Sequence, residues 1–233
     1  MWPFSQKTHR LFTISLTPKT ITFAVLQAKK NTHELCAYER TPLKQLEFAQ
    51  ALPFNTTKLK TIVTTFVKKH NLDQTQAAMS ISGPPIFEKI VTISTAHPEK
   101  KDFELPELKN FNWDFLYLCP SERKGFDFFV CGIKPHHLFS YQLFAQRCGL
   151  KLATLTTSQL AHLHLYKYLH ADTFRQAKLS LDLLQQRYDV KTLSTEKQLC
   201  DAISINGDLS VDLQKEYSFL KPALGLFLAE RYG

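Results

Sequence analysis

Glycine and cysteine are scarce in this chain, with seven and five among 233 residues. Because glycine lets a backbone approach a phosphate closely, so few glycines leave little room for phosphate-binding loops. The patterns G-x-x-x-x-G-K-[ST] and G-x-G-x-x-G are both absent. The five cysteines are odd in number, widely spaced and form no C-x-x-C pair. This argues against a disulfide framework or a zinc site and for reduced thiols in a cytosol.

Long apolar runs are missing as well. The apolar run near the end, at residues 223–229, is far shorter than the roughly 20 residues that a membrane-spanning helix needs. Residues 1–4 are not followed by the hydrophobic region or the small-residue cleavage site of a signal peptide. With 44% hydrophobic residues, the chain still has enough apolar side chains to bury a sizeable core. These features predict a cytoplasmic globular protein.

Motifs for catalysis and metal binding are also absent. There is no H-E-x-x-H pair and no G-x-S-x-G nucleophile elbow. His162 and His164 fall on a predicted helix, where residues two apart point about 200° away from each other, so they are not placed to share a metal. We expect no catalytic, cofactor or metal site, and therefore no enzymatic activity.

Acidic residues are under-represented in the first third of the chain. The net charge is +8 overall, and residues 1–80 hold 11 Lys and Arg against 4 Asp and Glu. Such a segment predicts an acidic partner, an anionic membrane surface or nucleic acid, although a solvated basic face explains it equally well. The signature of an RNA-binding sheet is absent, so the aromatic stretch at residues 126–129 is expected to pack in a core.

The sequence does contain alternating strand patterns around one tight turn. Apolar residues alternate with others over residues 14–16 and 21–25, which predicts a two-stranded hairpin. The turn occupies residues 17–20, where Pro18 fixes φ. Further strands are predicted at 34–38, 77–82, 86–93, 113–118, 126–133, 190–193 and 202–205, and helices between 57 and 71, at 138–148, after Ser158, at 172–188 and at the end of the chain.

The hairpin resembles the first phosphate loop of actin-like ATPases, and specifically that of the PilM family of type IV pilus assembly. That family typically has I-D-I-G-S-S-S-V-K here, where the Asp works near the metal and phosphates and the Gly lets the backbone approach a phosphate. In this chain Ser15 stands at the Asp position and Thr17 at the Gly position, and Leu16, Pro18 and Lys19 complete the loop. The resemblance therefore implies a degenerate loop that binds no nucleotide cofactor.

Two other stretches carry the same resemblance. Residues 144–155 are similar to a family helix that ends in A-G-L-K and to the strand after it, with Thr156 at the position of an Asp. Residues 223–229 are similar to the A-L-G-L-A-L near the end of PilM proteins. The resemblance covers residues 8–169 and 217–233, and about 120 residues of the nucleotide-binding half look deleted or replaced, judged from typical domain sizes.

The resemblance implies a mixed α/β, actin-like (ribonuclease H-like) fold. The main subdomain would combine residues 1–83 with residues 153–233. A small strand-strand-helix-strand subdomain, residues 84–152, would be inserted in it.

By the same resemblance, the chain is a non-enzymatic scaffold of an inner-membrane type IV pilus or type II secretion platform. Its partner would be the cytoplasmic tail of a PilN-like membrane protein, which would lie between the two subdomains near Gly83, Pro84 and Pro85. The chain would be cytoplasmic and held at the inner membrane through that partner. Two alternatives rank lower: a nucleic-acid-binding module that uses the basic first third, and an FtsA-like division factor that binds membrane through a terminal helix.

Overall fold

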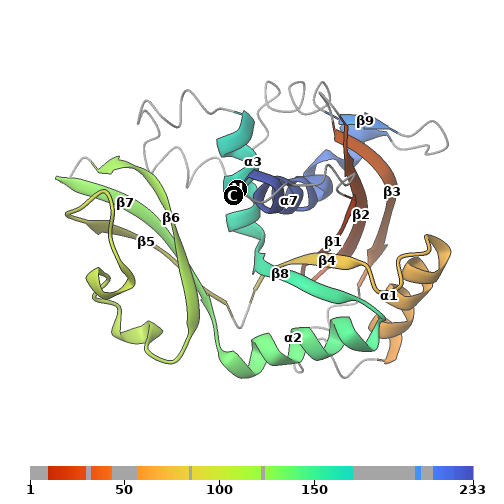
Figure 1. The fold of residues 1–233 in the computed structure, drawn as a ribbon, viewed down its shortest axis with the longest axis horizontal. Coiled ribbons are helices and arrows are strands. Elements are labelled where there is room, and N and C mark those ends of the chain that lie inside the picture. The colour runs from red at the N-terminus through yellow and green to blue at the C-terminus, as the bar shows by residue number, and fades with distance from the viewer. Residues whose placement is uncertain are drawn as a thin grey trace, which may run out of the picture.

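Two β-sheets and four main helices make up the described part of the chain (Figure 1). The computed structural model describes residues 10–29, 33–43, 57–83, 86–121, 124–169, 203–205 and 212–232. The large sheet has the strand order β8-β4-β1-β2-β3-β9, and the small sheet has the order β5-β7-β6. The large sheet consists of β1 (Arg10–Leu16), β2 (Thr20–Ala28), β3 (His33–Pro42), β4 (Gln76–Ile81), β8 (Lys151–Thr157) and β9 (Ile203–Ile205).

The large sheet is built on an antiparallel meander of β1, β2 and β3, to which β4 and then β8 add in parallel. Because successive side chains of a strand point to opposite faces, β1 supplies two cores at once. Phe12, Ile14 and Leu16 are buried on one face, whereas Leu11 packs into the cluster on the other. A strand with both faces buried explains why the six residues after Arg10 are all buried.

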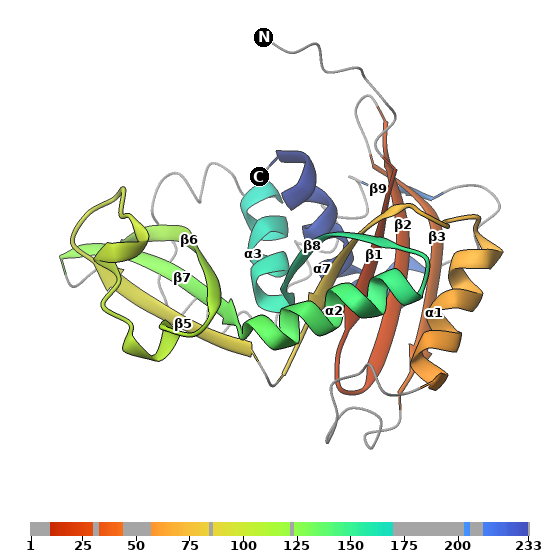
Figure 2. The ribbon, with the colours of Figure 1, turned by 60° about the horizontal axis from the view of Figure 1, so that its bottom comes forward.

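Helices cover both faces of the large sheet (Figure 2). On one face, α1 (Thr57–Lys69) places Phe66 against two sheet residues, with ring centroids 5.4 Å from Phe12 and 4.7 Å from Phe23. The same core takes up the buried side of α2 (Pro135–Arg147). On the other face, α3 (Ser158–Leu169) and α7 (Leu213–Tyr232) pack against the sheet and against each other.

The small sheet stands beside α3 and has its own core on each face (Figure 1). One face is covered by the segment that carries the short 3-10 helices, where Phe103 packs against Phe128 and Phe115. The other face packs Phe129 and Cys131 against Leu163 of α3. The small sheet consists of β5 (Ile86–Ile93), β6 (Asn112–Ser121) and β7 (Gly125–Ile133).

The predicted strands and helices within the described residues are present. The third strand, predicted at 34–38, runs on to Pro42. The aromatic residues at 126–129 do pack in cores, as expected. The predicted helix at 172–188 and strand at 190–193 lie outside the described residues. The division into subdomains stays a prediction, and α2, which the sequence places in the inserted part, buries Tyr141 and Phe144 in the core of the large sheet.

His162 of α3 makes the free energy of unfolding depend on pH. Its imidazole is largely buried beside Lys221, and burial lowers its pKa from 6.5 to about 4. Between pH 6.5 and pH 4 the unfolded chain therefore binds a proton that the folded chain does not. We expect the free energy of unfolding to fall by about 2–3 kcal/mol over this range through His162 alone. The His162→Gln variant should lose that part of the pH dependence in urea unfolding, whereas the exposed His97→Gln control should keep it.

Candidate functional site

In the turn at residues 17–20, backbone amides donate hydrogen bonds to a side chain of the same turn. The Thr17 hydroxyl accepts hydrogen bonds from the amides of Lys19 and Thr20, at 3.3 and 3.0 Å, and donates to the Thr20 carbonyl at 3.2 Å. A phosphate-binding loop needs such amides directed at the ligand. Here the Thr17 hydroxyl takes the hydrogen bonds of two of these amides, so the loop is closed on itself.

A neutral hydroxyl pair stands where the resemblance has a carboxylate. Ser15 and Ser80 face each other across β1 and β4, and their hydroxyl oxygens lie 3.0 Å apart. Both residues are buried, with 3% and 0% of their surface exposed. Magnesium in nucleotide sites is bound through carboxylates together with the phosphates, and a buried serine pair supplies no charge for it.

The Thr17 hydroxyl should contribute measurably to stability. Replacing Thr17 by valine keeps the shape but leaves two amides without their acceptor, so we expect the free energy of unfolding to fall by about 1 kcal/mol. Thr17→Ser retains the hydroxyl and should stay within about 0.5 kcal/mol of the parent in urea unfolding. Equal stability of the two variants would mean that water replaces the hydroxyl without cost and that the turn is not closed by Thr17.

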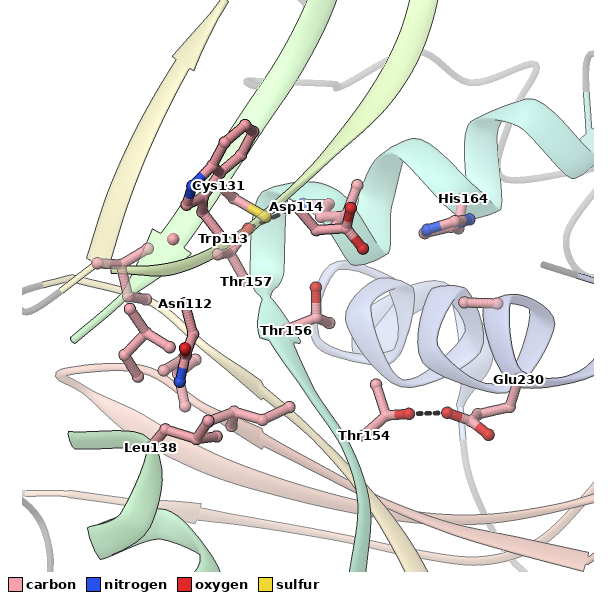
Figure 3. Close-up of a pocket in the computed structure, with 17 residues that line it drawn as sticks. Asn112, Trp113, Asp114, Cys131, Leu138, Thr154, Thr156, Thr157, His164 and Glu230 are labelled. Atoms are coloured by element: carbon pink, nitrogen blue, oxygen red, sulfur yellow. Dashed lines mark hydrogen bonds between the residues drawn. The ribbon is translucent and has the colours of Figure 1, made fainter. Parts of the chain in front are cut away.

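A second candidate site is a cavity of about 420 Å³ between the small sheet and the large sheet, here named the intersheet cavity (Figure 3). It is bordered by one end of the small sheet, by β8, by the first turns of α2 and α3, and by the last turns of α7. Its lining residues are Ile81, Ile86, Asn112, Trp113, Asp114, Cys131, Gly132, Ile133, Leu138, Thr154, Leu155, Thr156, Thr157, Leu160, His164, Ala229 and Glu230.

The polar groups of the intersheet cavity favour binding over catalysis. Burial, together with the nearby Glu88 and Asp114 carboxylates, raises the pKa of the Cys131 thiol to about 12, so the thiol stays protonated. Burial and Lys167 lower the pKa of His164, which keeps its imidazole neutral at pH 7. A protonated thiol is a poor nucleophile, because the thiolate is the reactive form. The cavity therefore offers hydrogen-bonding groups and apolar walls without an activated nucleophile.

The residues of the predicted degenerate phosphate loop lie outside the intersheet cavity. Ser15 and Leu16 are the last residues of β1, and Thr17, Pro18 and Lys19 belong to the closed turn. None of these five residues lines the intersheet cavity.

Two residues that flank the predicted partner groove line the intersheet cavity. Gly83 has φ of 90°, a left-handed conformation that favours glycine, and it follows the strand that ends at Ile81. Ile81 and Ile86, on either side of this segment, both line the cavity, whereas Pro84 and Pro85 lie outside the described residues. Partner binding at residues 83–85 stays a prediction.

Sequence reasoning missed the two carboxylates at the border of the cavity. Asp114 belongs to β6 and Glu230 to the last turns of α7, where Glu230 accepts a hydrogen bond from the Thr154 hydroxyl (Figure 3). They lie more than 100 positions apart and belong to no local motif. Only the packing of the small sheet on α3 brings them to one cavity.

Two features of the described residues bear on metals and membranes. Across the ranges given above, no three His, Cys, Asp or Glu side chains come together as metal ligands would. None of the helices described has the length and apolar character that crossing a membrane requires.

The chain matches no known family model and no curated protein by sequence. By structure, it is similar to a chain of the "PilM-PilN type IV pilus biogenesis complex", with a TM-score of 0.62 and 10% identity over 96% of this chain and 99% of that chain. This match shows that the chain has the fold of PilM-type actin-like proteins, and it confirms the predicted resemblance and fold class.

Two weaker structural similarities were also found. One is to the cytoplasmic domain of EpsL, an inner membrane component of the type II secretion system of Vibrio cholerae, with a TM-score of 0.42 and 13% identity over 66% of this chain. The other is to a Bacteroides thetaiotaomicron protein with an actin-like ATPase fold and unknown function, with a TM-score of 0.36 and 10% identity over 71% of this chain. The chain spans 59% and 58% of the lengths of these two relatives.

Proposed function

We propose that this chain is a scaffold of an inner-membrane assembly platform of the type IV pilus or type II secretion class. In this proposal it holds the cytoplasmic tail of a PilN-like membrane protein, stays in the cytoplasm and reaches the inner membrane through that partner. The observation that carries the proposal is the match of nearly the whole chain to a chain of the PilM-PilN complex. At 10% identity this match concerns the fold, and the closed turn and the intersheet cavity add support from the sites.

The closed turn supports a role without nucleotide hydrolysis. An ATPase needs free backbone amides for phosphate and a carboxylate for the metal. The amides of Lys19 and Thr20 are already bonded to the Thr17 hydroxyl, and a buried pair of Ser15 and Ser80 replaces the carboxylate. The chain thus has the hairpin of a phosphate-binding loop without free amides at Lys19 and Thr20 and without the carboxylate. This combination fits a binding protein better than an enzyme.

The intersheet cavity supports a role in binding an extended segment. Ile81 and Ile86, on either side of the segment where the sequence predicts the partner groove, line it, and its volume of about 420 Å³ is in the range of specific ligand sites. Its walls combine apolar residues, such as Leu138 and Leu160, with polar ones, among them Asn112 and three threonines of β8. Few convergent polar groups in an apolar cavity are typical of recognition sites.

A direct titration tests this proposal. The probe is a fluorescently labelled synthetic peptide with the sequence of the cytoplasmic tail of the PilN-like protein from the same organism. We expect saturable binding in fluorescence anisotropy at micromolar concentrations, and no binding of a scrambled peptide of the same composition. Equal binding of the tail and the scrambled peptide, or no binding of either at millimolar concentration, would contradict the proposal.

A further inference from the structure

The edge of β8 that has no partner among the described strands borders the intersheet cavity. Four consecutive residues, Thr154–Thr157, line it. Neighbouring side chains of a strand point to opposite faces of the sheet. A cavity that is bordered by four consecutive residues therefore lies along the edge of the strand and not over one face. β8 is the outermost strand of the large sheet and pairs with β4 alone among the described strands. Its outward amides and carbonyls therefore face the side on which the cavity lies.

An open edge of this kind is a template for another extended segment. Edge strands present unpaired backbone groups, and peptide-binding domains use them to add a partner strand through main-chain hydrogen bonds. In β8 a register shift between Ala77 and Ala78 leaves Ala153 without a partner, which marks a bulge at one end of the strand. Beyond the bulge, residues 154–157 pair regularly with β4, and this regular part borders the cavity.

The charge at the cavity border is opposite to that of the chain. The chain carries a net charge of +8, yet the described residues that line the cavity include Asp114 and Glu230 and no Lys or Arg. Neither carboxylate forms an ion pair with a described residue; Asp114 accepts from the amide of Phe115, and Glu230 accepts from Thr154.

A third carboxylate continues this acidic border. In the small sheet, Cys131 is paired with Asp114 on one side and with Glu88 on the other, so the three side chains share a face. No Lys or Arg among the described residues forms an ion pair with Glu88. Burial raises the pKa of Glu88 above its usual value, so the selection for positive charge rests on Asp114 and Glu230.

We propose that the intersheet cavity takes a basic, extended segment of a partner protein, which adds as a strand to the edge of β8 that borders the cavity and places Lys or Arg side chains against Asp114 and Glu230. The inference rests on the proposed function for its site and adds the chemistry of the partner. Main-chain hydrogen bonds to β8 supply affinity that is independent of sequence, and the carboxylates select for positive charge. His164, neutral at pH 7, does not offset this selection.

The test uses a phage-displayed library of random 12-residue peptides, selected against the full chain. Recovered peptides should be enriched in Lys and Arg. The tightest of them should bind about tenfold more weakly to the Asp114→Asn/Glu230→Gln variant and lose affinity as salt rises. A matched control, Asp73→Asn/Glu104→Gln, removes the same charge at two exposed sites outside the cavity and should bind like the parent. Hydrogen exchange should show new protection at residues 154–157 when the peptide is bound.

The outcomes separate this inference from the proposed function. Peptides without basic enrichment, unchanged affinity for the Asp114/Glu230 variant, protection confined to other strands, or recovery of no peptide would each overturn the inference. If the PilN-like tail binds the parent and the Asp114→Asn/Glu230→Gln variant equally well, the inference fails and the proposed function stands. If that tail does not bind while basic library peptides protect β8, the proposed function fails and the inference stands.

Discussion

Replacing Gly225 by alanine is expected to lower the free energy of unfolding by about 3 kcal/mol or more. Gly225 lies in α7 where this helix crosses α3, and a Cβ at this position would overlap the carbonyl oxygen of Ala161. The two helices can separate only by opening the cluster that holds Ala223, Leu224 and Leu165. An alanine that raises intrinsic helix propensity should therefore destabilise this protein, because the tertiary clash outweighs the gain.

Two controls make the Gly225 result specific. Ser218→Ala changes an exposed position of the same helix and should leave the urea midpoint nearly unchanged. Adding Ala161→Gly to the Gly225→Ala variant should give no rescue, because the obstructing atom belongs to the main chain. A stable Gly225→Ala protein, or rescue by Ala161→Gly, would contradict the close backbone approach of α3 and α7.

The second large effect is expected on partner binding. Ala229 lines the intersheet cavity from α7. Replacing it by tryptophan would fill much of the cavity, since a tryptophan side chain is far larger than a methyl group. We expect affinity for the tail peptide to fall about 100-fold, in line with the loss of a central contact of about 3 kcal/mol. The measurement is the same anisotropy titration that tests the proposed function.

The control for Ala229→Trp is Ser218→Trp, which puts the same side chain on an exposed part of α7 away from the cavity. Both variants should keep a melting temperature close to that of the parent. Ala229→Trp should lose binding, and Ser218→Trp should keep it. Full affinity of the folded Ala229→Trp variant would place the partner outside the intersheet cavity.

Much of the fold follows from local patterns. The alternation over residues 14–16 and 21–25 predicts the hairpin, and the apolar spacing after Thr57 predicts the buried face of α1. The resemblance to PilM proteins predicted the actin-like fold from a hairpin and a few short stretches, and the structural match confirms it at 10% identity. These features depend on neighbours in the sequence, which is why they are visible there.

The candidate site is less visible in the sequence. Asp114, Cys131, Thr156 and Glu230 come from four separate segments, and nothing in the local sequence of any one of them indicates that the others are close. The intersheet cavity exists because the small sheet packs on α3 through side chains such as Leu163, a long-range contact. Position 17 could be interpreted in part from the sequence. It has a threonine where the PilM family has a glycine, and threonine hydroxyls commonly accept hydrogen bonds from the amides of their own turn.

A paired calorimetric titration tests whether this protein binds its partner without a nucleotide. The protein is first titrated with MgATP, and the PilN-like tail peptide is then titrated with and without millimolar MgATP. We predict no saturable heat from ATP, and a peptide affinity that agrees within twofold in the two conditions. Saturable ATP binding, or peptide binding that requires MgATP, would show that the turn around Thr17 still holds a phosphate and that the protein is no nucleotide-independent scaffold.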